Sequence, residues 1–323
     1  MKNYFSDRTQ SVRVGISLSS SKTINKGVPQ GSIIGPLAFL LFINDLPNIS
    51  NVFNTVLFAD DTTISFKCNS VEQFNSVSNV EMHNFFKWAS ANKLIINLSK
   101  TYYIIHSFRN FSDVNFNLEI NNQTVEQVNQ GLFLGTYIDD KLKFKAHIDH
   151  ISSKISKSIG ILFKLSKLKA PKSILKHIYY SLVHSHLIYN IICYAGTYDT
   201  HVERLLLLQK RAIRIINKSS FLAHTDPLFH SNNILKVHDL YKFYVGVYMY
   251  DNWEAESFVV THNYNTRNLN SLVPGAARLT VTQNSLSVIG PNVWNSIPLI
   301  IRDSPTKSIF KNRFKAHLLS MYI

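Results

Sequence analysis

Two runs of strand-forming residues, separated by a pair of aspartates, constrain the fold of this chain more than any other feature. The runs cover residues 54–59 and 62–66, and only Asp60 and Asp61 stand between them. Such close spacing predicts an antiparallel hairpin with both carboxylates at its tip. Two ionised carboxylates in an apolar strand context repel each other and lose hydration unless a cation lies between them. A divalent metal ion at the hairpin tip would supply such a cation.

The two aspartates are not expected to be equivalent. Neighbouring residues of a strand point in opposite directions, so Asp60 is predicted to be the principal metal ligand and Asp61 an accessory ligand. The alternative interpretation is a solvated turn, because aspartate is common in turns. The pair alone favours the turn, and the sequence around it decides between the two interpretations.

Strand and helix signals alternate before the hairpin. Short β-type runs within residues 10–30 end in a loop at residues 27–32 that contains two glycines and a proline. Apolar residues then crowd from Ser32 onward and stop at Pro47. This run predicts a buried helix.

Strand and helix signals also alternate after the hairpin. Apolar residues at helical spacing predict a helix over residues 71–92, and β-type runs predict strands over 94–97 and 102–106. Helices mixed with short antiparallel strands indicate an α+β fold for this part of the chain.

The second half of the sequence is predicted to be helical. Apolar residues recur at steps of three or four along one helix stripe, at Ile148, Ile151, Ile155, Ile159 and Leu162. Another stripe of the same helix carries the lysines Lys154, Lys157 and Lys164. Further helices are predicted over residues 171–191 and 201–217. Glycine, proline and asparagine interruptions beyond residue 220 predict a looser region with short helices.

Positive charge is concentrated in one segment. The chain has a formal net charge of +14, and residues 141–220 contain 15 Lys and Arg against 3 Asp and Glu. A block this basic, in which lysines alternate with apolar residues, predicts a surface that lies along a phosphate backbone. The alternative interpretation is a solvated lysine-rich face without a partner.

Several classes of protein are excluded by the sequence. It has no apolar run of the roughly 18 residues that a membrane span needs and no apolar signal region at its start, so an intracellular protein of the cytosol or nucleus, without membrane contact, is expected. Two isolated cysteines, Cys68 and Cys193, do not make a disulfide framework. The 13 histidines lack cysteine partners and a metalloprotease pattern, so no zinc site is predicted.

Several motifs, in a fixed order, carry a family resemblance. The segment GVPQGSIIGPL at residues 27–37, followed by FADD at 58–61, closely resembles the template-contacting loop and the metal-binding hairpin of reverse transcriptases. Residues 88–101 look like the next motif of the polymerase palm, and Phe133-Leu134-Gly135 resembles the primer-gripping hairpin. Segments that resemble jockey- and CR1-like LINE polymerases follow, at 147–154, 209–214, 264–267 and 290–295. The chain is identified as a member of the reverse transcriptases, or RNA-directed DNA polymerases, of non-LTR retrotransposons.

The resemblance implies a domain organisation. Residues 1–140 would form a partial polymerase palm, an antiparallel sheet with helices. Residues 141–220 would form an all-helical thumb, and residues 221–323 a C-terminal extension. The activity implied is RNA-templated DNA synthesis from an RNA template, a DNA primer and deoxynucleoside triphosphates, with Mg²⁺ or with Mn²⁺ in its place.

The resemblance also implies roles for individual residues. Asp60 and Asp61 would hold the metal, and Lys100 would protonate the leaving pyrophosphate. Contacts to template and incoming nucleotide would come from Pro29, Gln30, Gly31, Phe58 and Ala59. The primer would be supported by Phe133, Leu134 and Gly135, and the nucleic-acid backbone would be followed by Lys154, Lys157 and Lys164.

One departure from the family pattern affects the expected activity. Reverse transcriptases supply another metal-binding aspartate from an earlier Phe-Asp motif, and Met1 falls after the place where that motif would end. The basic fingers residues that hold the triphosphate would also precede Met1. The sequence is therefore expected to be N-terminally truncated and inactive as a polymerase by itself.

Two alternatives remain at this stage. The first is a non-catalytic nucleic-acid-binding remnant of a decayed element, which the absent aspartate supports. The second is a viral-type RNA-dependent RNA polymerase. Those enzymes tend to carry Gly-Asp-Asp at the hairpin, whereas this chain has Phe58-Ala59 before its aspartates.

Overall fold

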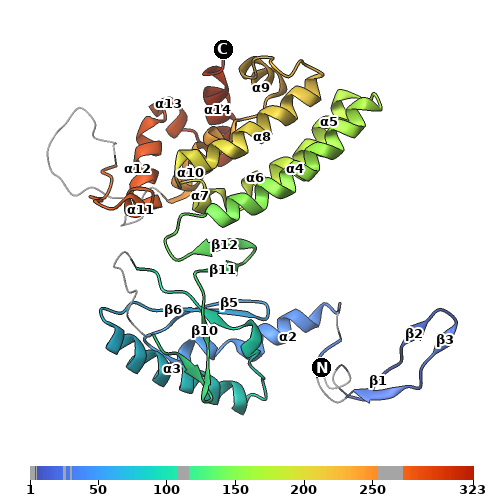
Figure 1. The fold of residues 1–323 in the computed structure, drawn as a ribbon, viewed down its shortest axis with the longest axis vertical. Coiled ribbons are helices and arrows are strands. Elements are labelled where there is room, and N and C mark those ends of the chain that lie inside the picture. Colours follow the sequence, from blue (N-terminus) through green and yellow to red (C-terminus); the bar gives the residue numbers. More distant parts are fainter. Residues whose placement is uncertain (1–3, 5, 25–26, 30, 108–115, 253–271) are drawn as a thin grey trace. The chain divides into compact units, whose positions relative to one another are not determined.

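The structure, a computed structural model, contains two compact units (Figure 1). It describes residues 4, 6–24, 27–29, 31–107, 116–252 and 272–323. The first unit comprises Met1–Tyr103 and Asn110–Gln127, and the second comprises Ile104–Arg109 and Val128–Ile323. Helices and short strands are both present, so the predicted mixture of α and β structure is confirmed, whereas its division into palm and thumb stays a prediction.

The first unit begins with two exposed strand pairs. β1 (Arg8–Gln10) pairs antiparallel with β4 (Lys22–Ile24), and β2 (Arg13–Val14) pairs with β3 (Ser17–Leu18) between them. These pairs confirm the short strands predicted within residues 10–30.

The helix predicted after Ser32 is present as α2 (Ile34–Ile43), and a 3₁₀ helix, η1 (Leu46–Ile49), follows it. The prediction that α2 is buried is wrong, because Leu41 is 67% exposed and only Gly35 and Ile43 are buried. A helix that is apolar on all sides needs neighbours on all sides to be buried, and the described residues supply few of them.

The predicted aspartate hairpin is confirmed. β5 (Asn54–Phe58) pairs antiparallel with β6 (Asp61–Ser65), with Phe58 opposite Asp61. Ala59 and Asp60 therefore form a two-residue turn, and Ala59 adopts a left-handed φ of 50°. At the base of the hairpin, Phe53 and Phe66 have their ring centroids 5.4 Å apart.

The predicted helix over residues 71–92 is α3 (Val71–Ala91). The Ser70 hydroxyl caps its first turn by accepting from the Gln73 amide at 3.1 Å. Phe74 on its buried face stacks on Phe66, with a centroid distance of 5.7 Å, and also contacts the rings of Tyr103 and Phe116. This aromatic cluster joins α3 to the base of the hairpin.

The predicted strand over residues 94–97 is absent. α3 ends in a Schellman motif, in which the Lys93 amide donates to the Ser90 carbonyl and the Leu94 amide donates to the Ala89 carbonyl. Lys93 adopts a left-handed φ of 59°, which turns the chain sharply, and no described strand pairs with the next residues. A 3₁₀ helix, η2 (Leu98–Lys100), follows instead.

The strand predicted over 102–106 is confirmed in part. It is β7 (Tyr102–Tyr103), which pairs parallel with β10 (Glu126–Gln127). β8 (Glu119–Ile120) and β9 (Gln123–Thr124) form a further antiparallel pair. The described strands thus form two-stranded pairs, five antiparallel and one parallel.

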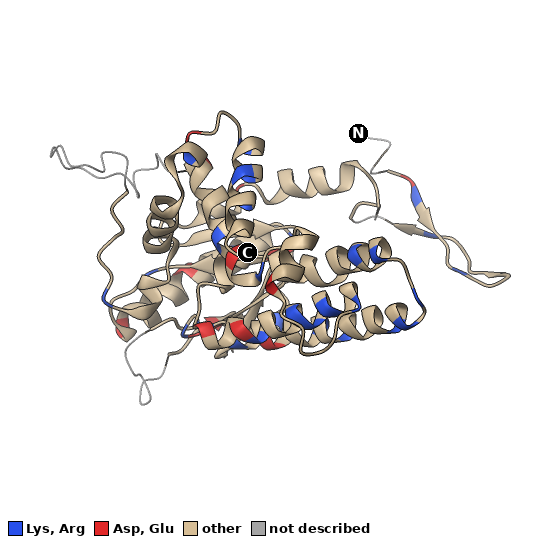
Figure 2. Ribbon diagram, turned by 90° about the horizontal axis from the view of Figure 1, so that it is seen from above, with Lys and Arg blue, Asp and Glu red and all other residues tan. Residues whose placement is uncertain are grey.

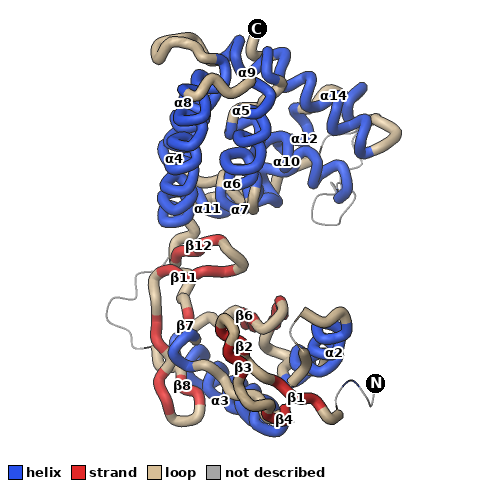
Figure 3. Tube along the Cα trace, turned by 90° about the vertical axis from the view of Figure 1, so that its right-hand side faces the viewer, coloured by secondary structure: helices blue, strands red, loops and turns tan. Residues whose placement is uncertain are grey.

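The second unit begins with one more hairpin and continues as helices (Figure 3). β11 (Gln130–Phe133) pairs antiparallel with β12 (Thr136–Asp139). The helix that follows, α4 (Lys145–Lys167), buries all five residues of the predicted apolar stripe. The segment predicted as a helix over 171–191 is α5 (Lys172–Tyr179), the π-helical turn η3 (Tyr180–His184), α6 (Ser185–Ile188) and the start of α7 (Ile191–Tyr194).

The helix predicted over 201–217 is α8 (Asp199–Asn217). Beyond it lie α9 (Asp226–Asn232), α10 (Val237–Asn252), α11 (Thr280–Gln283), α12 (Leu286–Ser296), α13 (Leu299–Arg302) and α14 (Lys307–Ser320). The short helices predicted beyond residue 220 are confirmed by α9, α11 and α13. The looser packing predicted there is wrong, because Met249, Trp294 and Phe310 are buried in the same core as α4 and α8. Among the described residues, no helix combines the length and the apolar character needed to cross a bilayer.

A buried glutamine connects three segments of this core. Gln209 on α8 is fully buried, and its Nε2 donates to the Tyr179 hydroxyl of α5 at 2.8 Å and to the Leu235 carbonyl at 2.8 Å. Its Oε1 accepts from the Val237 amide at the start of α10 at 2.9 Å. One side chain therefore satisfies polar groups on both sides of residue 220.

Replacing this glutamine with a residue of similar size tests its importance. Gln209→Met leaves a buried hydroxyl, carbonyl and amide without this partner, so we expect the free energy of unfolding to fall by about 2–4 kcal/mol. The measurement is denaturant unfolding followed by helical circular dichroism. Gln283→Met, at an exposed position in α11, is the control and should change stability by less than about 0.5 kcal/mol. Equal losses in the two variants would contradict the role of Gln209.

Candidate active site and nucleic-acid surface

The tip of the β5–β6 hairpin presents two carboxylates to solvent. Asp60 lies in the turn, Asp61 opens β6, and both are exposed. Phe58 and Ala59 beside them are also exposed, Phe58 at 62%. The tip is accessible while the base is held by the aromatic cluster around Phe74.

These carboxylates fit the requirements of a hard divalent cation. Within the residues that the structure describes, no group of three or more His, Cys, Asp or Glu side chains is arranged to hold a metal. Mg²⁺ is commonly held by one or two carboxylates and completes its six oxygen ligands with water and substrate phosphates. An accessible pair such as Asp60 and Asp61 leaves room for those ligands.

The loop before α2 is a tight turn. The Ser32 hydroxyl donates to the Pro29 carbonyl at 2.7 Å and accepts from the Gly35 amide at 3.2 Å. Gly31 has a φ of 79°, a left-handed value that favours glycine, and it is exposed. A Cβ at Gly35 would come within 2.8 Å of the Ser32 hydroxyl. Gln30, also predicted to contact template or nucleotide, lies outside the described residues.

Lys100 is exposed at the end of η2, in the same unit as the aspartate hairpin. Its ammonium group makes no hydrogen bond or ion pair with the described residues, so it is free to meet an anion. Its role in proton transfer stays a prediction.

The second predicted hairpin turn belongs to the second unit. Leu134 and Gly135 connect β11 to β12 with φ values of 44° and 80°. Phe133 and Leu134 are half-buried and Gly135 is exposed, so part of the turn is accessible. Whether it touches a primer stays a prediction.

The basic face of α4 has few acidic neighbours. Lys154, Lys157 and Lys164 are exposed, and none of them forms an ion pair with a described residue. The single acidic residue of the helix, Asp149, pairs instead with Arg204 of α8. In Figure 2, Lys and Arg (blue) recur along the helical ribbons at the lower right, where little Asp or Glu (red) is drawn. This exposed charge is available to a phosphate backbone.

A histidine at the start of α4 is buried and lies within electrostatic range of Lys154. His147 Nδ1 accepts from the Tyr137 amide at 3.4 Å, and its ring contacts Tyr194 edge to face at a centroid distance of 5.0 Å. Burial, with His150 and Lys154 as smaller causes, lowers the pKa of His147 to about 4. The imidazole is therefore neutral at pH 7, as its role as an acceptor requires.

Comparison with known proteins shows what the first part of the chain is similar to. Residues 1–138 match the family "Reverse transcriptase (RNA-dependent DNA polymerase)". This part of the chain is similar to reverse transcriptases. The resemblance seen in the loop and hairpin motifs is thereby confirmed.

The similarity to retrotransposon polymerases extends beyond the reverse transcriptase segment. The RNA-directed DNA polymerase from mobile element jockey of Drosophila melanogaster is 26% identical over 251 residues. The probable polymerase from transposon X-element of the same species is 24% identical over 247 residues, and the jockey polymerase of Drosophila funebris is 25% identical over 250. Each alignment covers 74% of this chain and 27% of the relative. The chain thus spans about a quarter of these relatives, and no solved structure matches it significantly.

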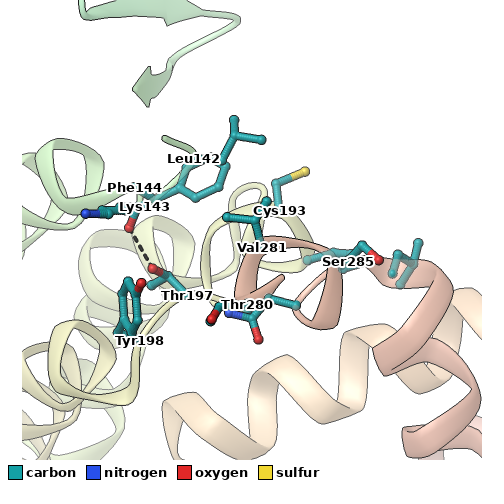
Figure 4. A pocket seen from close by; sticks show the side chains of 13 residues that line it. Leu142, Lys143, Phe144, Cys193, Thr197, Tyr198, Thr280, Val281 and Ser285 are labelled. Carbon is teal, nitrogen blue, oxygen red and sulfur yellow. Dashed lines mark hydrogen bonds between the residues drawn. The ribbon is translucent and has the colours of Figure 1, made fainter. Parts of the chain in front are cut away.

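The structure also contains a cavity that the sequence did not predict (Figure 4). It has a volume of about 310 Å³ and lies in the helical unit, lined mainly by apolar side chains such as Leu142, Phe144 and Val281. On its wall, the Thr197 hydroxyl donates to the Lys143 carbonyl at 2.6 Å. Its lining comes from three distant parts of the sequence, which no local pattern could bring together.

The neutral histidines of the helical unit make its stability depend on pH. The pKa of His147 is about 4 in the folded chain, and burial also lowers that of His184 to about 4. The unfolded chain, with the ordinary pKa near 6.5, takes up these protons first. We therefore expect the contribution of these two histidines to stability to be constant above about pH 7, to fall as the pH drops from 6.5 toward 4, and to level off below that range.

Unfolding midpoints at pH 7 and pH 5 test this expectation. His147→Asn keeps an oxygen acceptor near the Tyr137 amide but does not titrate, so it should lose less stability between the two pH values than the parent. His224→Asn, at an exposed position, should keep the parental pH dependence. An unchanged pH dependence in His147→Asn would contradict the neutral buried imidazole.

Proposed function

We propose that this chain carries part of the active site and part of the nucleic-acid surface of an RNA-templated DNA polymerase. The observation that carries the proposal is the accessible Asp60-Asp61 hairpin tip within the segment that matches the reverse transcriptase family. The family match favours DNA synthesis over the viral-type RNA polymerase alternative.

The first unit would provide the chemistry. Asp60, with Asp61 as accessory, would hold a divalent metal ion, Mg²⁺ or Mn²⁺. A bound metal supplies charge stabilisation for the attacking 3′ oxygen of the primer and for the leaving pyrophosphate. Lys100 would donate a proton to that pyrophosphate, for which its exposed ammonium group is suited.

The loop and the hairpin tip would bind the substrates. Gly31 has no side chain and would allow close approach of the template or the incoming deoxynucleoside triphosphate to the backbone. Pro29 and Gln30 would flank this contact, and the exposed Phe58 and Ala59 would complete it beside the metal ligands.

The second unit would hold the template–primer duplex. Phe133, Leu134 and Gly135 would support the DNA primer strand, and the unpaired ammonium groups on α4 would contact phosphates. Such contacts are largely independent of base sequence.

A second candidate function is nucleic-acid binding without catalysis. It is favoured by the location of the α4 lysines, which lie in a different unit from Asp60 and would bind phosphate without it. Binding that does not depend on Asp60 is common to both candidates, whereas primer extension belongs to the polymerase alone.

Primer extension on an RNA template tests the catalytic role. In a chimera that joins this chain to the upstream part of the jockey polymerase, we expect Asp60→Asn to reduce the rate by at least about 100-fold, because a metal ligand is lost. Asp61→Asn should reduce it less. Glu126→Gln, an exposed carboxylate outside the hairpin, is the control. Near-parental rates in both aspartate variants of an active chimera would rule out the hairpin as the metal site.

The salt dependence of duplex binding tests the basic surface in the chain itself. Each neutralised phosphate contributes about −0.9 to the slope of log K against log salt, so changing Lys154, Lys157 and Lys164 to alanine should make that slope shallower by about 2–3. The control replaces three lysines of the C-terminal segment, Lys242, Lys307 and Lys311. The first two of these already pair with Asp239 and Asp251. An unchanged slope in the α4 variant would mean that these lysines face solvent only.

A further inference from the structure

The turn between β11 and β12 is held in a demanding conformation. Left-handed φ values at both Leu134 and Gly135 are typical of a type I′ turn, whose first position favours Asn, Asp or Gly. For a leucine, the left-handed region is unfavourable by about 1–2 kcal/mol. A two-stranded hairpin is also only marginally stable by itself. Contacts from outside the hairpin must therefore stabilise this turn.

Those contacts come from the link between α6 and α7, about 55 residues later in the sequence. The Tyr189 hydroxyl donates to the Leu134 carbonyl. The same ring lies 3.4 Å from the place where a side chain at Gly135 would begin, so it packs closely on the turn. One tyrosine thus contacts both residues of the turn, while Gly135 keeps an exposed side.

The next residue extends the contact to β12. Asn190 Nδ2 donates to the Thr136 hydroxyl at 2.7 Å, and Thr136 is buried. Asn190 itself adopts a left-handed φ of 53°, which asparagine tolerates better than most residues. This conformation lets Tyr189 and Asn190, although adjacent, both reach the hairpin.

The other end of the hairpin is attached to α4. The Asp139 carboxylate accepts from the Lys143 amide at 2.9 Å and from the Phe144 amide at 2.6 Å, and the Tyr137 amide donates to His147. The turn is thus tied to α6–α7 and its exit is tied to α4. Hydrogen bonds therefore link the hairpin to the lysine-bearing helix within the second unit.

We propose that Tyr189 and Asn190 are positioning residues that fix the Leu134–Gly135 turn where it meets the 3′ end of the bound primer. The inference rests on the proposed function, in which this turn supports the primer. Duplex affinity comes mainly from phosphate contacts of the lysines, whereas the local environment of the primer terminus depends on where the turn is held. Loss of the Tyr189–Asn190 contact should then alter the terminus without weakening the duplex.

The experiment uses the whole chain and an RNA–DNA duplex with 2-aminopurine at the 3′ end of the DNA strand. Two variants loosen the turn from opposite sides: Tyr189→Phe removes the donor to Leu134, and Thr136→Val removes the hydroxyl that Asn190 contacts. Thr136→Ser restores that hydroxyl. Tyr180→Phe is the control, because its hydroxyl makes no hydrogen bond with the described residues.

We expect Tyr189→Phe and Thr136→Val to bind the duplex within about 2-fold of the parental affinity, because the lysines are unchanged. The fluorescence of the bound 2-aminopurine should differ from the parental value in both and should return to it in Thr136→Ser. Amide hydrogens of residues 130–139 should also exchange on the order of 10-fold faster in both loosened variants. Tyr180→Phe should match the parent in all three measurements.

Two results would overturn the inference, and they differ from each other. Tight duplex binding with parental fluorescence in both loosened variants would reject the positioning role and leave the proposed function intact. Absence of duplex binding by the parental chain would reject the proposed nucleic-acid surface, and the positioning role with it.

Discussion

Gln209 places an amide where three segments of the helical unit meet, and each of its hydrogen bonds satisfies a polar group that burial has removed from water. A buried amide without partners is strongly unfavourable, whereas a fully satisfied one specifies how its neighbours pack. The region before residue 220 and the region after it are therefore packed as one structure. The basic helix α4 is attached to this structure as well. The helix that carries Gln209, α8, also forms an ion pair with α4 through Arg204 and Asp149.

The first unit must meet two requirements at once. Its proposed chemistry needs carboxylates that are exposed to water, and the strand pair that carries them must still be held to the rest of the unit. The aromatic cluster of Phe53, Phe66 and Phe74 buries the base of the β5–β6 hairpin, and the tip extends from it with both carboxylates exposed. The base of the hairpin can be buried while its tip is in water, because the five residues of each strand separate the two ends. The same division explains why the aspartates keep access to metal and phosphate.

Local pattern predicted the elements well and their surroundings less well. The β5–β6 hairpin, α3 and α4 follow from spacing alone, since a two-residue connection and a three-to-four residue apolar period each permit few alternatives. The prediction that α2 is buried was wrong because the apolar residues of a helix show only that it could pack against other elements. They do not show whether such elements lie beside it. The strand expected at 94–97 is absent because a Schellman motif at Lys93 ends the preceding helix. The left-handed conformation of Lys93 could not be predicted from the residue type, since lysine rarely adopts it. The packing beyond residue 220 depends on contacts with α4 and α8. The glycine, proline and asparagine residues of that region give no information about those contacts.

The sequence by itself determined the resemblance to reverse transcriptases, the aspartate pair and the concentration of charge, because each of these depends on adjacent residues or on their periodic spacing. It also placed Lys154, Lys157 and Lys164 opposite an apolar stripe, since helical geometry follows from spacing. Only the tertiary structure decided that Tyr189 contacts the Leu134–Gly135 turn and that Gln209 joins α5, α8 and α10. Those contacts link residues between 26 and 55 positions apart, and hydrogen bonds over such separations depend on how whole helices pack rather than on any local preference of the chain.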